Sequence, residues 1–298
     1  MSERLEFPLI NYNGILKSKS EGLFSFSNRS FMYGDGLFET VRISNSRPLF
    51  LSEHFERLFD GAEILGFRVP KNRDELREEI IRFIEINNIV EGRMRLALYR
   101  NDGGYYAPDS DEASYLISAS ALSVPAFQFN EKGLHLGIHP YLRKSVSILS
   151  EIKSTSALQY VMAARYGKSQ GWDDTILLND EEKLCETASS NLFLVLPGRQ
   201  IVTPKQGEGL LPGVFRKNLL RCLSEHDIDV SETTLTSDVL LQAEELFICN
   251  SIKGIQWVVS YGQKRYFGSF TRTISQKMND WTQHLHDTLN SELDYPES

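Results

Sequence analysis

The sequence has no hydrophobic run long enough to cross a membrane. Its longest apolar runs, Leu192 to Leu196 and Leu246 to Cys249, have the length of strands, whereas a membrane helix needs about 20 apolar residues. The start of the chain, MSERLEFPLI, lacks the basic beginning and the long apolar stretch of a signal peptide. We therefore expect a cytoplasmic protein with no membrane partner.

Cysteine and histidine are also scarce, and positively charged residues are outnumbered by negatively charged ones. The three cysteines are widely spaced and odd in number, which favours reduced thiols over disulfides or a zinc site. The six histidines form no cluster with the spacing of metal ligands, so we expect no metal. A net charge of −8 creates no overall field that attracts nucleic acid. The ordinary expectation for such a chain is an enzyme that acts on a small molecule.

What the sequence does contain suffices for two domains. It has 298 residues, 41% of them hydrophobic, which is enough to bury a core without disulfides. Strand-like and helix-like segments alternate irregularly, without a regular βαβ rhythm, and this predicts a two-domain α+β protein. We place the N-terminal domain at 1–121, a linker at 122–133 and the C-terminal domain at 134–298. The linker segment LSVPAFQFNEKG carries Pro, Asn and Gly between two strand-like stretches.

Several elements can be placed from their residue patterns. Alternation of apolar and polar residues in RMRLALYR predicts a half-buried strand at 93–100. Ser52 is expected to cap a helix whose apolar residues follow helical spacing. The helices that we expect cover residues 52–66, 74–87, 156–169 and 213–224.

Four signals in the sequence each have an ordinary explanation but fit one cofactor together. The glycine-rich turn at 207–213 precedes a helix and could bind a phosphate through its backbone N–H groups, or be only a tight connection. Lys153 could form a Schiff base, although most such lysines are solvated. Glu186 and Arg57 could equally be an edge-strand carboxylate and a surface arginine. A phosphate site, an amine, an arginine and a carboxylate are what pyridoxal phosphate requires.

The chain resembles the fold-type IV pyridoxal-phosphate enzymes. These include branched-chain aminotransferases, D-amino-acid transaminases and 4-amino-4-deoxychorismate lyases. The resemblance runs in order through NRSFMYGDGLFETVRI, HFERL, IKSTSALQYVMAARY, ETASSNLF, GLLPGVFR and ELFICNS. It implies a smaller N-terminal α/β sandwich, a larger C-terminal barrel-like domain and pyridoxal 5'-phosphate in the cleft. It also implies a homodimer in which the partner subunit supplies part of the substrate pocket.

The resemblance further implies roles for single residues. Lys153 would form the aldimine with the cofactor and move the proton, and Glu186 would pair with the pyridine nitrogen. Arg57 would bind the phosphate. Further cofactor contacts would come from the start of the helix after the glycine-rich turn and from the motif ELFICNS, at Val214, Phe215, Asn250 and Ser251.

The choice of reaction depends on three positions. Thr40 resembles the lyases, in which a threonine here is the acid/base partner of the lysine. Leu158 replaces the tyrosine of the branched-chain enzymes, and Asn250 is similar to the lyases where the branched-chain enzymes have a Gly-Thr pair. We therefore predict a 4-amino-4-deoxychorismate lyase that forms 4-aminobenzoate and pyruvate. The alternatives are a D-amino-acid transaminase and, after it, a branched-chain L-amino-acid transaminase.

The residues that bind the carboxylate of the amino substrate are less well marked. Tyr105 stands where the lyases have an arginine, and Gly104 and Tyr106 stand where the D-amino-acid transaminases have an arginine and a histidine. Two of the remaining arginines alternate on one strand, so they share a face that lines either the cleft or solvent. The candidate substrate-binding residues are therefore Arg29, Arg93, Arg95, Tyr105 and Tyr106.

Overall fold

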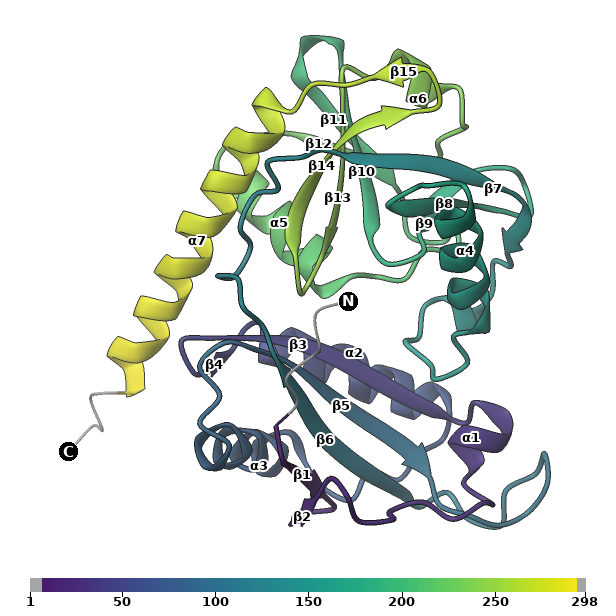
Figure 1. Ribbon diagram of the computed structural model, residues 1–298, viewed down its shortest axis with the longest axis vertical. Coiled ribbons are helices and arrows are strands. Elements are labelled where there is room, and N and C mark those ends of the chain that lie inside the picture. Colours follow the sequence, from purple (N-terminus) through teal and green to yellow (C-terminus); the bar gives the residue numbers. More distant parts are fainter. Residues whose placement is uncertain (1–6, 294–298) are drawn as a thin grey trace. The chain divides into compact units, whose positions relative to one another are not determined.

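The computed structural model describes residues 7–293 and divides the chain into two compact units (Figure 1). The first unit comprises residues 1–128 and 146–162, and the second comprises 129–145 and 163–298. Residues 1–6, which belong to the stretch tested for a signal peptide, lie outside the described part. Within the described part, the helices are too short or too polar to cross a membrane.

The first unit is built on a six-stranded sheet in which every neighbouring pair is antiparallel. The strand order is β2-β1-β6-β5-β3-β4. Its elements are β1 (Leu9–Tyr12), β2 (Ile15–Ser18), α1 (Arg29–Tyr33), β3 (Gly36–Ser44), β4 (Arg47–Pro48), α2 (Leu51–Ile64), α3 (Arg73–Ile86), β5 (Gly92–Arg100) and β6 (Ala113–Ala121).

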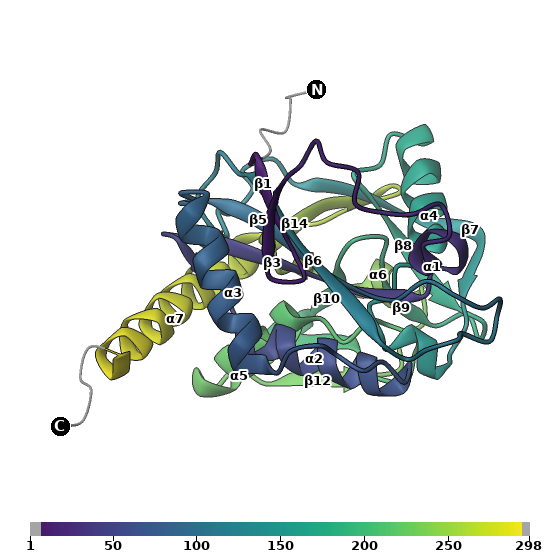
Figure 2. The same cartoon turned by 90° about the horizontal axis from the view of Figure 1, so that it is seen from below.

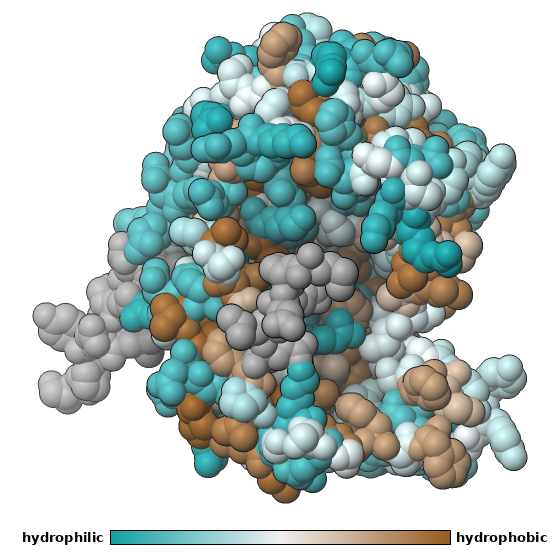
Figure 3. Space-filling model, in the orientation of Figure 1, coloured by the Kyte–Doolittle hydropathy of each residue, from teal (hydrophilic) through white to brown (hydrophobic). Residues whose placement is uncertain are grey.

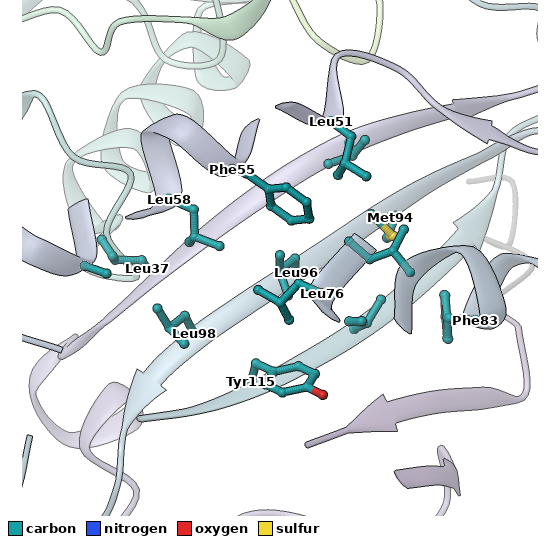
Figure 4. Packing of buried hydrophobic residues seen from close by; sticks show 14 of the residues in the cluster. Leu37, Leu51, Phe55, Leu58, Leu76, Phe83, Met94, Leu96, Leu98 and Tyr115 are labelled. Carbon is teal, nitrogen blue, oxygen red and sulfur yellow. The ribbon is translucent and has the colours of Figure 1, made fainter. Parts of the chain in front are cut away.

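Helices α2 and α3 lie on one face of this sheet and bury the core of the unit (Figures 1 and 2). Figure 4 shows Phe55 and Leu58 of α2 and Leu76 of α3 packed over Leu96 and other apolar residues of the strands. The predicted helices and the predicted strand in this region are confirmed. The helices bury residues at helical spacing and the strands bury alternate residues. Both periods are visible in the sequence, which explains why these elements could be predicted.

The expected cap at Ser52 is wrong. Helix α2 begins one residue earlier, and its N-cap is Phe50, which has a left-handed backbone and makes no side-chain capping bond. The Ser52 hydroxyl instead accepts a hydrogen bond from Arg77 Nη2 at 3.1 Å. The hydroxyl therefore links α2 to α3 rather than ending a helix.

The second unit contains a nine-stranded mixed sheet that curls around its own core (Figures 1 and 2). The strand order is β12-β11-β10-β13-β14-β7-β8-β9, with β15 paired to β14. The strands are β7 (Leu134–Lys144), β8 (Asp174–Asn179), β9 (Leu184–Thr187), β10 (Asn191–Leu196), β11 (Gln200–Pro204), β12 (Val230–Thr233), β13 (Glu245–Asn250), β14 (Gly254–Tyr261) and β15 (Lys264–Arg265).

Helices and short 3-10 turns connect these strands. The two turns are η1 (Ile148–Ser150) and η2 (Pro197–Arg199), and the helices are α4 (Leu158–Ser169), α5 (Val214–Glu225), α6 (Val239–Gln242) and α7 (Ser269–Leu293). Helix α4 matches the helix expected from about residue 156, and α5 begins directly after Gly213 as expected. All three cysteines are free, as expected of reduced thiols, and the structure shows that all three are buried.

The boundary between the units differs from the predicted one. Residues 146–162 follow the first strand of the second unit in sequence but belong to the first unit. Within the first unit, Phe38 N donates to Lys153 O at 2.9 Å and Thr155 N donates to Gly36 O at 2.8 Å. The segment therefore pairs with the start of β3. A composition shift along the sequence carries no information about such a return of the chain.

Candidate active site

Lys153 is half-buried in the first unit and held from both sides. Ile152 beside it is buried in the core of the unit, and Ser154 forms a bridge with Leu37 at the start of β3. The Lys153 ammonium lies 4.6 Å from the centroid of the Phe38 ring. A lysine fixed at its backbone and packed on an aromatic ring is shielded from water, which is what an amine nucleophile requires.

The face of the sheet opposite α2 and α3 carries three of the predicted residues. Thr40 on β3 stands directly across from Arg95 on β5, and Arg93 lies two residues before Arg95 on the same face. The Arg95 guanidinium lies 3.6 Å from the centroid of the Phe38 ring, the ring that Lys153 also approaches. Lys153 and Arg95 therefore share one aromatic ring, and Thr40 stands across from Arg95.

Arg95 has no ion pair among the side chains that the structure describes, which extend to residue 285. Burial, together with the charge of Arg93, lowers the pKa of its guanidinium. A half-buried cation beside another cation gains most from an added anion. This part of the sheet can therefore bind a carboxylate.

Arg57 is fixed by a buried network that joins α2 to β3. Its Nε and Nη2 donate to the two carboxylate oxygens of Glu39 at 2.8 and 2.6 Å, and His54 Nδ1 lies 2.6 Å from the same carboxylate. Burial alone would raise the pKa of Glu39, but Arg57 and His54 outweigh it and lower this pKa to about 2. The ionised Glu39 therefore sets the direction of the Arg57 fork.

His54 in this network is neutral. Burial lowers its pKa against the opposing effect of Glu39, and the charges of Arg57 and Lys153 add to the lowering. Its Nδ1–H donates to Glu39, while Nε2 is buried with no hydrogen-bond partner among the described residues. The charge of Lys153 therefore contributes to the lowered pKa of His54 in this network.

Glu186 lies in the second unit on β9 and is only 4% exposed. Lys144, at the end of β7, donates from its ammonium to Glu186 Oε1, and Leu211 N donates to Glu186 Oε2 at 3.0 Å. Both partners are hydrogen-bond donors, and each holds one oxygen of the carboxylate. A carboxylate held in this way is a group that can pair with a protonated ring nitrogen.

The glycine-rich turn leads from Leu211 into helix α5. Asn191 Nδ2 donates to Leu211 O at 2.9 Å, and the N-cap residue Gly213 makes no side-chain capping bond. A Cβ at Gly213 would lie 2.0 Å from Asn191 Oδ1, so only glycine fits. The N–H groups of Val214 and Phe215 at this helix start form a site of the kind that binds phosphate.

Asn250 connects two loops of the second unit. Its Nδ2 donates to Ser190 Oγ at 2.9 Å, and its Oδ1 accepts from the backbone N–H groups of Ile252 and Lys253. These bonds fix the turn that carries Ser251, which is half-buried. The hydrogen bonds of the Asn250 amide therefore orient the neighbouring Ser251.

Arg29 is buried and bonded to a loop of its own unit. Its Nε donates to Asp35 at 2.8 Å, and its Nη1 donates to the backbone carbonyls of Gly103 and Tyr105 at 2.8 and 2.6 Å. The loop presents the rings of Tyr105 and Tyr106, which are 85% and 91% exposed. Arg29 therefore fixes the loop that carries both tyrosines.

Three features meet the needs of pyridoxal 5'-phosphate. Lys153 offers a shielded amine in the first unit. In the second, Glu186 offers a buried carboxylate, and the start of α5 offers backbone N–H groups beside a position where a Cβ would clash. The predicted residues are divided between the two units, and in each unit their chemistry suits the cofactor.

Sequence reasoning missed the residues that hold the predicted ones in place. Glu39 and His54 orient Arg57, Phe38 supports Lys153, and Lys144 pairs with Glu186. One signal was available: His54 and Arg57 are three apart on a predicted helix and so share a face. No local pattern joins Lys144 to a carboxylate 42 residues away.

Known proteins resemble this chain over most of its length. The profile described as Amino-transferase class IV matches residues 36–261. The D-alanine aminotransferase of Listeria monocytogenes is 26% identical over 243 residues, 80% of this chain and 82% of its own. The aminodeoxychorismate lyase of Bacillus subtilis is 25% identical over 248 residues, 82% and 83% of the two chains. The branched-chain aminotransferase structure of Escherichia coli has a TM-score of 0.83 at 25% identity, covering 90% and 92%.

Proposed function

The chain belongs to the class IV aminotransferase family of pyridoxal-phosphate-dependent enzymes, and we propose from this that it is a 4-amino-4-deoxychorismate lyase. The family, the α+β fold and the cofactor agree with the prediction from the sequence motifs. The proposed reaction removes the enolpyruvyl group from the amino substrate and yields 4-aminobenzoate and pyruvate. The observation that carries the proposal is the pairing of Thr40 with Arg95 beside the ring that supports Lys153.

The residues of the first unit divide the proposed reaction among them. Bound pyridoxal phosphate supplies a ring that accepts electrons from the carbon bearing the amino group. The Lys153 amine removes the proton from that carbon, and the Thr40 hydroxyl donates a proton to the departing enolpyruvyl group. Arg95 binds a substrate carboxylate, with Arg93 beside it for a second one.

The cofactor contacts are proposed in the same way. Arg57, fixed by Glu39, binds the phosphate together with the N–H groups of Val214 and Phe215. The Ser251 hydroxyl adds a donor, and Asn250 orients the turn that carries it. Glu186 pairs with the pyridine nitrogen, which keeps that nitrogen protonated.

Among the candidate substrate residues, the contacts favour Arg95 over Arg29. Arg29 is engaged with Asp35 and with the carbonyls of its loop. Tyr105 and Tyr106 are exposed and available for contact with a substrate or a second subunit. We therefore propose that Arg29 acts on the substrate only through the shape of this loop.

The Thr40→Val variant tests the lyase. Valine keeps the branched shape but cannot donate a proton, so formation of 4-aminobenzoate from aminodeoxychorismate should fall about 100-fold. Ser118→Ala is the control. Ser118 on β6 pairs with Arg95 on β5, whose other neighbour is Thr40 on β3, so this variant also removes a hydroxyl next to Arg95. The control should retain the parent rate. An equal loss of elimination and of half-transamination in Thr40→Val would contradict the lyase.

An aminotransferase is the second candidate, because relatives with that name match this chain as well as the named lyase does. A D-amino-acid transaminase comes first and a branched-chain L-amino-acid transaminase second, since Leu158 and Asn250 depart from the branched-chain pattern. Titration of the purified protein with D- and L-amino donors, followed by visible absorption, separates them. Conversion of the cofactor band to the pyridoxamine form would identify a transaminase and the enantiomer it uses.

We also propose that the enzyme is a cytoplasmic homodimer. Figure 3 shows hydrophobic side chains at the surface of the first unit, at the bottom of the view. Exposed aromatic residues of this unit include Phe26, Phe31, Tyr105 and Tyr106, and exposed apolar groups of this kind are typical of subunit interfaces. Light scattering should give twice the mass of the chain, and a monomer would contradict the proposal.

A further inference from the structure

The second unit contains a buried ion pair that the proposed reaction does not use. Lys144 ends β7 and stands opposite Asn179 on β8, while Glu186 lies on β9 at the other side of β8. Their side chains meet across β8 and are 3% and 5% exposed. Two ionised groups at this depth are stable only because each compensates the other.

The pair is rigidly positioned. Glu186 Oε2 accepts from Leu211 N at 3.0 Å, so one carboxylate oxygen faces Lys144 and the other is bonded to the turn that leads into α5. The carboxylate therefore has a fixed direction without any bound cofactor. The turn that precedes the uncapped start of α5 is fixed by the same carboxylate.

We propose that Lys144 is the resident counter-ion of Glu186, a positioning residue that holds this carboxylate in place and aims it before the cofactor binds. The inference rests on the proposed contact between Glu186 and the pyridine nitrogen. Once the protonated ring is bound, Glu186 serves two cations at once. The charge of Lys144 then weakens the hold of Glu186 on the ring nitrogen, so Lys144 also moderates the electron demand of the ring.

Other ionisable groups near the pair do not replace Lys144. Cys185 on β9 is neutral, because burial raises the pKa of its thiol to about 12. Asp180 in the turn after β8 and Glu208 in the glycine-rich turn are both acidic. Glu208 accepts hydrogen bonds from Asn179 and Thr234. Both carboxylates favour the Lys144 cation and cannot neutralise Glu186.

The Lys144→Met variant tests the inference through the stability of the cofactor-free protein. Without the ammonium, the buried Glu186 carboxylate loses its ion-pair partner, and the cost of burying it is greatest where the carboxylate carries its charge. Stability then falls as the pH rises. We expect the thermal midpoint to drop by about 5 °C, with a larger drop at pH 8 than at pH 6. Lys144→Arg should restore most of the loss.

A double-variant cycle separates this role from simple packing. In Lys144→Met/Glu186→Gln the loss should be smaller and independent of pH, because neither position of the pair then carries a charge. Arg143→Met is the control, since Arg143 is the neighbouring residue and pairs with the exposed Glu182 at 2.6 Å. The inference would be overturned if Lys144→Met lowered the thermal midpoint by the same amount in the parent and in Glu186→Gln, and by the same amount at pH 6 and pH 8.

The cofactor gives a second readout. Added pyridoxal phosphate should raise the midpoint of Lys144→Met more than that of the parent, because the protonated ring replaces the missing cation. An unchanged increment would also contradict the inference. Glu186→Gln alone tests the premise: if it leaves the cofactor's absorption spectrum and affinity as in the parent, the proposed contact of Glu186 with the ring fails, whatever the stability cycle shows.

Discussion

At the scale of single residues, Glu39 is a buried charge at the centre of the network that holds Arg57. It is 1% exposed and holds a guanidinium and an imidazole at once. A buried carboxylate is stable only with such partners. The direction of Arg57, and with it the proposed phosphate contact, therefore depends on a residue that does not itself meet the cofactor.

The pH dependence of stability follows from Glu39. Its pKa is about 2 in the folded state, against 4.5 without the surrounding protein. The ionised carboxylate therefore stabilises the fold fully above pH 4.5, and this contribution, about 3 kcal/mol, is lost as the pH falls towards 2. Denaturant unfolding of the parent and of Glu39→Gln should show a free-energy difference that shrinks over this range.

Glu112→Gln is the matched control for this prediction. Glu112 pairs with Arg68 at 3.1 Å, but both side chains are exposed, at 52% and 73%. Exposed pairs contribute little to stability, so this variant should unfold with the parent at every pH. A constant difference between Glu39→Gln and the parent down to pH 2.5 would contradict the assignment of a low pKa to Glu39.

At the scale of elements, the glycine-rich turn and α5 act as one device. Glu186 and Asn191 bind the N–H and the carbonyl of Leu211, and the close approach of Asn191 to Gly213 fixes where the helix begins. The helix start has no side-chain cap. Helix starts of this kind are typical sites for binding an anion.

Gly213→Ala tests this arrangement. The new methyl group would lie 2.0 Å from Asn191 Oδ1, so the turn or Asn191 must shift. We expect a loss of roughly 1–3 kcal/mol in unfolding free energy and weaker binding of pyridoxal phosphate, measured by absorbance titration. Gly22→Ala is the control, because its Cβ would meet nothing within 4 Å. Parent-like cofactor affinity in Gly213→Ala would contradict the phosphate site.

At the scale of the whole molecule, the chain leaves the first unit, begins the second and returns. Residues 146–162 bring Lys153 and Ile152 back to β3. Ile152 is buried in the core of the first unit, although 134–145 before it form a strand of the second. The proposed reactive lysine is thereby carried by the same unit as Thr40 and Arg95.

Ile152→Ala tests this organisation. The cavity should cost about 2–4 kcal/mol, and hydrogen exchange should show the loss of protection in β3 and β5 of the first unit. Ile176→Ala on β8 is the control, because Ile176 is buried in the core of the second unit. It should reduce protection there. A loss of protection confined to the second unit in Ile152→Ala would contradict the observed division.

The sequence by itself indicated several of the elements, the family and the candidate residues of the site. Apolar spacing gave α2, α3 and β5, because one buried face imposes a period on the chain. Motifs such as HFERL and ETASSNLF pointed to Arg57 and Glu186 as cofactor residues. These features are local, so a short stretch of residues suffices to reveal them.

Only the tertiary structure decided which groups support these residues. The pairing of Glu39 with Arg57, of Lys144 with Glu186 and of Phe38 with Lys153 joins positions that are 18, 42 and 115 residues apart. The return of residues 146–162 to the first unit also joins parts of the chain that are far apart in the sequence. Long-range contacts of this kind depend on how the elements pack, and packing leaves no periodic trace in a single sequence.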